Sequence, residues 1–127
     1  MMLILTMIAT PAVAADQFDL ECVGTKSEKI DQQGEPISFG IVVDLRAKQF
    51  CWKQECEVKT IDEVLPDRVY FLKHDPTDRE IFSKMEIDRK TGKFEWLIIQ
   101  KNLSRYYLKQ EAVCTPAKFT GFPATKF

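Results

Sequence analysis

Apolar and polar residues alternate along much of this chain, and that alternation constrains the fold more than any other feature of the sequence. Successive side chains of a β-strand point to opposite faces, so an alternating segment has one apolar and one polar face. The clearest case is residues 39–46, where the odd-numbered positions are all apolar. The same pattern recurs in residues 18–22, 81–87, 94–99 and 106–114. These segments predict β-strands.

Turn signals separate the segments at intervals of about 8–12 residues, as in β-barrels and sandwiches. Gly92 favours a hairpin between two of the segments, because glycine readily takes the left-handed conformation that closes such a loop. We expect residues 46–49 to form a turn, residues 26–36 a loop or a weak edge strand, and residues 62–65 at most one helical turn. The predicted fold is mostly β: a small antiparallel β-barrel or sandwich of about seven or eight short strands, with at most one or two helical turns.

The start of the chain is predicted to be a secretory signal peptide. Residues 1–15 carry no charged side chain, and a short apolar core is followed by Ala12-Val13-Ala14, the small residues that a signal peptidase requires. Cleavage after Ala14 or Ala15 leaves one β domain, residues 16–127, in the periplasm or outside the cell. A membrane anchor is the alternative, but it needs about 20 apolar residues and this stretch is shorter. We therefore expect no stable insertion in a membrane after cleavage.

The last part of the chain has a different character. Residues 115–127 contain Pro116, Gly121 and Pro123, which argue against a central strand. The same residues include three phenylalanines, too many for a free tail. We expect residues 115–127 to form an irregular segment that packs back on the domain.

Four cysteines, Cys22, Cys51, Cys56 and Cys114, form an even set in a chain predicted to be exported, so disulfides are expected. Three pairings are possible. We favour Cys51–Cys56, across a tight bend, together with Cys22–Cys114, which joins the first strand to the last if the sheet closes. A redox site is the alternative for the first pair, but the spacing C-x4-C is not the C-x-x-C of thioredoxin-like sites. A zinc site needs more Cys and His ligands at short spacings than the chain supplies.

No motif of catalysis, nucleotide binding or metal binding is visible, so we expect no enzyme activity, no cofactor and no metal. The only histidine, His74, precedes Asp75-Pro76, a sequence typical of a turn, and is expected on a loop. The formal net charge is −1, and lysines and arginines are spread along the chain. This distribution argues against nucleic acid as a partner.

A binding surface is the functional feature that the residues best support. Trp52 and Tyr107 fall out of phase with the buried positions near them, and Lys53 lies in the bend between Cys51 and Cys56. We expect Trp52, Lys53 and Tyr107 to be exposed and available to a partner. The first hypothesis is thus an exported, non-enzymatic binding module for an unidentified protein. The alternatives are a carrier of a small apolar ligand, which requires a cavity of roughly several hundred Å³ inside the barrel, and a structural protein of the cell envelope.

In size, predicted export and number of strands the chain is similar to the small periplasmic lysozyme inhibitors, which are also compact β-barrels with disulfides. No motif carries this resemblance. It implies an inhibitor-like domain that binds another protein.

Overall fold

In a computed structural model, residues 15–30, 32–101 and 107–123 are described. Within these ranges the chain forms nine β-strands and no helix. The strands are β1 (Gln17–Ser27), β2 (Glu35–Asp44), β3 (Gln49–Trp52), β4 (Glu55–Thr60), β5 (Glu63–Val64), β6 (Arg68–Leu72), β7 (Ile81–Asp88), β8 (Lys93–Gln100) and β9 (Tyr107–Ala117).

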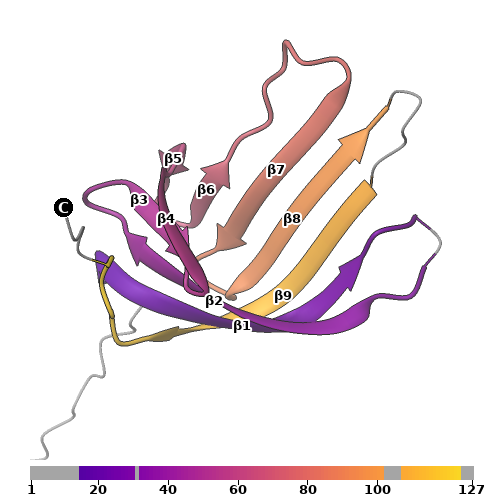
Figure 1. Cartoon of the computed structure of the whole chain (residues 1–127). Helices are drawn as coiled ribbons and strands as arrows, with labels where there is room; N and C mark the ends of the chain where they lie inside the picture. Colours follow the sequence, from indigo (N-terminus) through magenta and orange to yellow (C-terminus); the bar gives the residue numbers. More distant parts are fainter. Residues whose placement is uncertain (1–14, 31, 102–106, 124–127) are drawn as a thin grey trace, which may run out of the picture.

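All nine strands belong to one antiparallel sheet, in the order β4-β3-β2-β1-β9-β8-β7-β6-β5. Strands β4 and β5 form opposite edges of this sheet, although only Ile61 and Asp62 separate them in sequence. A flat nine-stranded sheet is roughly 38 Å wide, whereas that connection spans roughly 10 Å. The sheet must therefore curl, and it forms a half-barrel whose concave face is the interior (Figure 1).

Backbone hydrogen bonds tie the connection to both sides of the half-barrel. The N–H of Ile61 donates to the carbonyl of Lys48, just before β3, over 2.8 Å. The N–H of Asp62 donates to the carbonyl of Tyr70 in β6 over 3.1 Å. The side chain of Ile61 is also fully buried, so it anchors the connection to the core, whereas Asp62 is exposed.

The predicted fold class is confirmed, with differences in detail. The expected helical turn at residues 62–65 is wrong, because Glu63–Val64 pair with β6 as a short edge strand. The expected loop at residues 26–36 is shorter than predicted, since β1 continues to Ser27 and β2 begins at Glu35. The turn at residues 46–49 is present over residues 45–48. The extra short strands explain why nine are observed rather than seven or eight.

The core lies on the concave face, where alternate positions of neighbouring strands meet. Its largest fully buried side chains are Leu20, Ile41, Val43, Ile61, Val69, Phe71 and Phe94. These residues fill the end of the half-barrel where β4 passes to β5. A void at this end, next to Phe71, has a volume of only about 20 Å³. This half of the interior is therefore packed rather than hollow.

All four cysteines are bonded, in the pairing that the sequence favoured. Cys22 and Cys114 face each other in register on β1 and β9, with their Cα atoms 4.0 Å apart. Cys51 and Cys56 lie in the β3–β4 hairpin, with their Cα atoms 4.9 Å apart. Two bonds of this kind persist in an oxidising compartment rather than in the cytosol.

The segment that follows Cys114 begins later than predicted. Residues 115–117 continue β9, opposite residues 19–21 of β1. Pro116 is tolerated there because the N–H of Cys114, two residues earlier, points to the β8 side. The nitrogen of Pro116 faces the same side, where the pairing of β8 with β9 has already ended at Val113. Proline therefore removes no hydrogen bond from the ladder.

Beyond β9, Thr120 is hydrogen-bonded to Asp19 on the convex side of β1. Its N–H donates to one carboxylate oxygen over 3.1 Å and its hydroxyl to the other over 2.8 Å. The predicted signal peptide lies almost wholly outside the described residues, as does the end of the chain after residue 123. Among the described residues there is no helix of the length and apolarity needed to cross a membrane.

Candidate functional site

A groove with a volume of about 740 Å³ occupies the open end of the concave face. Its floor is a row of side chains that stand directly opposite one another on β1, β9 and β8, namely Lys26, Gln110 and Trp96. Phe39 of β2 and Trp52 of β3 line it beside the packed core. The groove thus begins where the core ends, on the same face of the same sheet.

Strand β4 supplies the outer wall of the groove. Glu55, Glu57 and Lys59 line it, while the residues between them do not. This spacing of two is what a strand produces when one of its faces looks into the concavity. Together with Lys26, these residues give the lining two positive and two negative formal charges, which balance.

The aromatic side chains of the groove rest on the core. The ring centroids of Phe39 and Trp52 are 5.5 Å apart, and those of Trp52 and Trp96 are 5.4 Å apart with their planes 31° from parallel. Phe94, which is fully buried, lies beneath them at 5.2 Å from Phe39 and 6.4 Å from Trp52. Such ring pairs add about 0.5–1.5 kcal/mol beyond area burial, so the platform is held in place before any ligand arrives.

The indole N–H of Trp96 is a buried donor without a hydrogen-bond partner. An unsatisfied buried donor costs about 1–3 kcal/mol, and native proteins contain few of them. The side chain of Trp96 lines the groove, but its indole nitrogen has essentially no exposed surface, so a ligand acceptor could reach it only if the indole moved.

The three residues expected to form one exposed surface do not come together. Trp52 is half-buried and faces the groove, because it is in phase with the core residue Phe50 on β3. Tyr107 begins β9 opposite Ile99 and is in phase with the exposed Val113, so it lies on the convex side. Lys53 is exposed in the β3–β4 turn and also reaches the convex side.

On that side the ammonium of Lys53 lies 3.0 Å from Glu21 and 3.3 Å from Asp19. The hydrogen bond to Glu21, and then the one to Asp19, raise the pKa of Lys53. Asp19 is fully buried, and its carboxylate also accepts the two hydrogen bonds from Thr120. Lys53 therefore anchors the hairpin to β1 and is not free for a partner.

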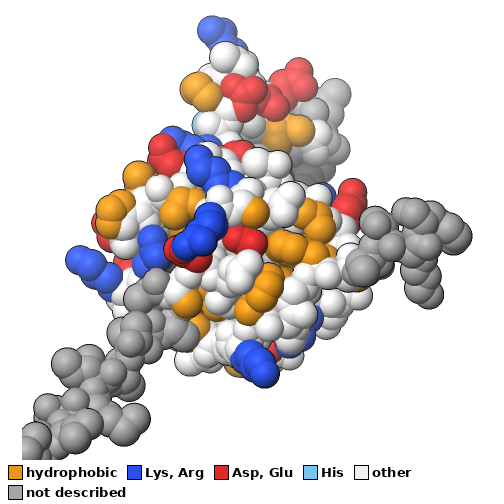
Figure 2. Space-filling model, turned by 90° about the vertical axis from the view of Figure 1, so that its left-hand side faces the viewer, with side chains coloured by type: hydrophobic (Ala, Val, Ile, Leu, Met, Phe, Trp, Pro, Cys, Tyr) orange, Lys and Arg blue, Asp and Glu red, His pale blue; other side chains and the backbone are white. Residues whose placement is uncertain are grey.

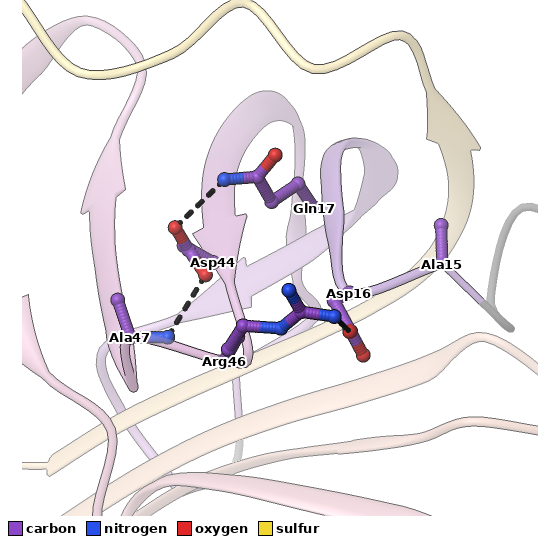
Figure 3. Close-up of a pocket in the computed structure, with 6 residues that line it drawn as sticks. All are labelled: Ala15, Asp16, Gln17, Asp44, Arg46 and Ala47. Atoms are coloured by element: carbon purple, nitrogen blue, oxygen red, sulfur yellow. Dashed lines mark hydrogen bonds and ion pairs between the residues drawn. The ribbon is translucent and has the colours of Figure 1, made fainter.

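A second pocket, of about 450 Å³, lies at the start of β1 and is shown in Figure 3. Its charged groups are satisfied within the pocket. Asp44 accepts hydrogen bonds from the side chain of Gln17 and from the N–H of Ala47, both at 2.9 Å, and Arg46 is paired with Asp16 at 2.9 Å. These contacts, drawn in Figure 3, engage both carboxylates of the pocket with its own residues, so it is less suited to an external ligand than the groove.

The Asp44 carboxylate is expected to make the fold sensitive to acid. The hydrogen bond from Ala47, followed by that from Gln17, lowers the pKa of Asp44 below its ordinary value of 3.8. A lowered pKa contributes stability that is present above the ordinary value and is lost as the pH falls through the folded value. In urea unfolding, Asp44→Asn should therefore lower the free energy of unfolding at pH 7 more than at a pH of about 2.5. An equal loss at both pH values would contradict this assignment.

His74 lies in the connection between β6 and β7, and its ring centroid is 4.3 Å from that of Phe82. In the described part of the chain, no three Cys, His, Asp or Glu side chains are grouped closely enough to hold a metal ion. The groove is therefore the arrangement with the most evident capacity to bind.

Sequence reasoning missed Lys26 and Gln110, although the signal was present. Each occupies a position that continues the buried phase of its strand, after Leu20 and Cys22 on β1 and before Ala112 and Cys114 on β9. A polar residue on the face of a strand that is otherwise apolar indicates that the apolar core ends at that point along the strand.

Comparisons of this chain with models of protein families, with curated proteins and with solved structures find no match.

Proposed function

We propose that this protein is an exported, non-enzymatic binding domain that holds its ligand in the aromatic groove. The observation that carries the proposal is the close pair of Trp52 and Trp96, whose ring planes are 31° from parallel and which lines the groove at the open end of the half-barrel. Aromatic platforms combined with a few polar groups are typical of sites that bind small molecules.

The lining favours one kind of ligand. The rings of Phe39, Trp52 and Trp96 favour a flat apolar face. The amide of Gln110 and the balanced charges along the rim favour a polar edge without a large net charge. The ligand is therefore a ring-bearing small molecule with hydrogen-bonding substituents. A purely apolar ligand inside a hollow barrel is less well supported, since the other half of the interior is packed.

Export is the second part of the proposal. Both disulfides suit an oxidising compartment, and the predicted signal peptide directs the chain to the periplasm or to secretion. In such a compartment a covalently cross-linked sheet offers a binding groove that keeps its shape.

The anionic dye 8-anilinonaphthalene-1-sulfonate, which carries a flat ring system and a polar group, is a suitable probe. We expect it to bind with one-to-one stoichiometry, and Trp52→Ala should weaken binding roughly tenfold or more, as loss of a central tryptophan commonly does. Fluorescence titration of the oxidised protein measures both.

Tyr107→Ala is the matched control, because it also truncates a half-buried aromatic residue, but on the convex side. It should leave the dissociation constant unchanged. If Trp52→Ala and Tyr107→Ala have equal effects, or if Trp52→Ala has none, the groove is not the binding site.

A further inference from the structure

Strand β4 is an edge of the sheet with an exposed face. Five of its six residues are exposed, among them Val58, which is 44% exposed. Among the residues that the structure describes, no strand pairs with its outer side. The other edge, β5, has only two residues, so it offers almost no backbone for pairing. Edge strands with free backbone groups readily accept another strand, and proteins usually shorten or cover them.

The backbone groups that β4 presents outward can be identified from its inner side. N–H and C=O groups of alternate residues point to opposite sides of a strand. The N–H of Ile61 donates to the carbonyl of Lys48, on the β3 side. The N–H and C=O groups of Thr60 therefore point away from β3, and so do those of Val58, two residues earlier. Val58 is therefore at the centre of the free edge, with unpaired groups on either side of it.

The charges of β4 are arranged symmetrically about the same residue. Glu57 precedes Val58 and Lys59 follows it, and both point into the groove. Their mutual ion pair is long, at 3.9 Å, and both side chains are substantially exposed. In an antiparallel pair of two such strands centred on Val58, each Glu57 stands opposite a Lys59.

We propose that β4 pairs with the β4 strand of a second copy of this chain, antiparallel, about a two-fold axis at Val58. A two-fold contact uses the same surface on both copies and closes on itself, so it yields a dimer and not a fibre. The short β5 edge leaves no complementary site at which the sheet extends further. Figure 2 shows the left-hand side of the molecule in Figure 1, where hydrophobic side chains are set among charged ones.

The pairing has a consequence for the groove. Because Glu57 and Lys59 line the outer wall, the dimer places the second copy's Lys59 and Glu57 beside that wall. Each groove is then bordered by side chains from both copies. The dimer does not depend on the ligand proposed above, since it rests on β4 alone.

A charge-reversal series tests the pairing by sedimentation equilibrium of the oxidised protein over a range of concentrations. Wild-type protein should show a monomer–dimer equilibrium. Lys59→Glu puts like charges opposite each other twice, and it should raise the dimer dissociation constant about tenfold or more. The double variant Glu57→Lys/Lys59→Glu restores opposite charges and should return the constant to near the wild-type value.

Val58→Pro is the second variant, because it removes an outward N–H without touching the ladder with β3, and proline is accepted on edge strands. It should abolish the dimer while the near-ultraviolet circular dichroism stays that of wild type. A wild-type protein that is monomeric up to about 1 mM, or a double variant that associates no better than Lys59→Glu, would overturn the proposal. So would a Val58→Pro variant that is folded and still dimeric.

Discussion

Replacing both Cys22 and Cys114 with alanine is expected to lower the free energy of unfolding by about 4–5 kcal/mol. The bond joins residues 92 apart in sequence, so its loss restores a large conformational entropy to the unfolded chain. Both sulfurs are also buried against the core, and their removal leaves a void. A typical domain has a free energy of unfolding of about 5–15 kcal/mol, so this loss is a large part of the total stability. Urea denaturation followed by circular dichroism measures the change.

The second disulfide provides the matched control. Cys51 and Cys56 close a loop of only a few residues, and the same entropy argument assigns that bond about 2 kcal/mol. The Cys51→Ala/Cys56→Ala variant should therefore lose about half as much stability as the Cys22→Ala/Cys114→Ala variant. If loss of the short disulfide lowers the free energy of unfolding as much as loss of the long one, the entropic role assigned to the long disulfide is wrong.

Gly24→Ala is expected to have the second-largest effect, a loss of roughly 3 kcal/mol, at the upper end for overpacked sites. Gly24 lies on the concave side of β1 opposite Ala112. A Cβ there would overlap the carbonyl oxygen of Glu111 and would lie 2.5 Å from the Cα of Ala112. These are backbone atoms of β9, close to the Cys22–Cys114 bond, so they cannot move aside without disturbing the junction of the first and last strands. Thermal and urea unfolding both report the loss.

Gly40→Ala is the control for that substitution. Gly40 also lies within a strand, but the atom nearest to an added Cβ is the Cδ of Lys53, at 2.9 Å. The close atoms belong to a side chain and not to the backbone of a paired strand, so this variant should lose less stability than Gly24→Ala, by about 1 kcal/mol or more. A finding that Gly24→Ala is tolerated as well as Gly40→Ala would mean that β1 and β9 are farther apart than described.

Alternation predicted the parts of the fold in which one face of a strand is buried along its length. Leu20, Ile41 and Phe94 were identifiable as core residues in this way, and all three are fully buried. The long disulfide was predictable for the same reason, because Cys22 and Cys114 share the buried phase of the first and last long strands.

The closure of the half-barrel was not predictable. It depends on β5, whose two residues are too few to show any period, and on Ile61, a single apolar residue between two edges. Trp52 was misplaced because Cys51 and Trp52 are adjacent and both apolar. Alternation cannot assign two adjacent residues to faces when both are apolar and both are at least partly buried. Here Cys51 is buried on the convex side, and Trp52 faces the groove.

The groove was missed because its residues come from different strands, and predicting it requires the order of those strands in the sheet. Trp96 stands beside Gln110, and Gln110 beside Lys26, only once β8, β9 and β1 are placed in this order. No spacing within the sequence links these three residues.

The indole N–H groups of the two tryptophans give the most direct test of the groove as a binding site. The chain has only Trp52 and Trp96, so a proton–nitrogen correlation spectrum contains two indole signals, which single Trp→Phe variants assign. During titration with 8-anilinonaphthalene-1-sulfonate, both signals should move together with one dissociation constant, while the amide signals of Val23 and Val113 on the convex side stay in place. Shifts confined to Val23 and Val113, with both indole signals unmoved, would contradict a ligand site between the tryptophans.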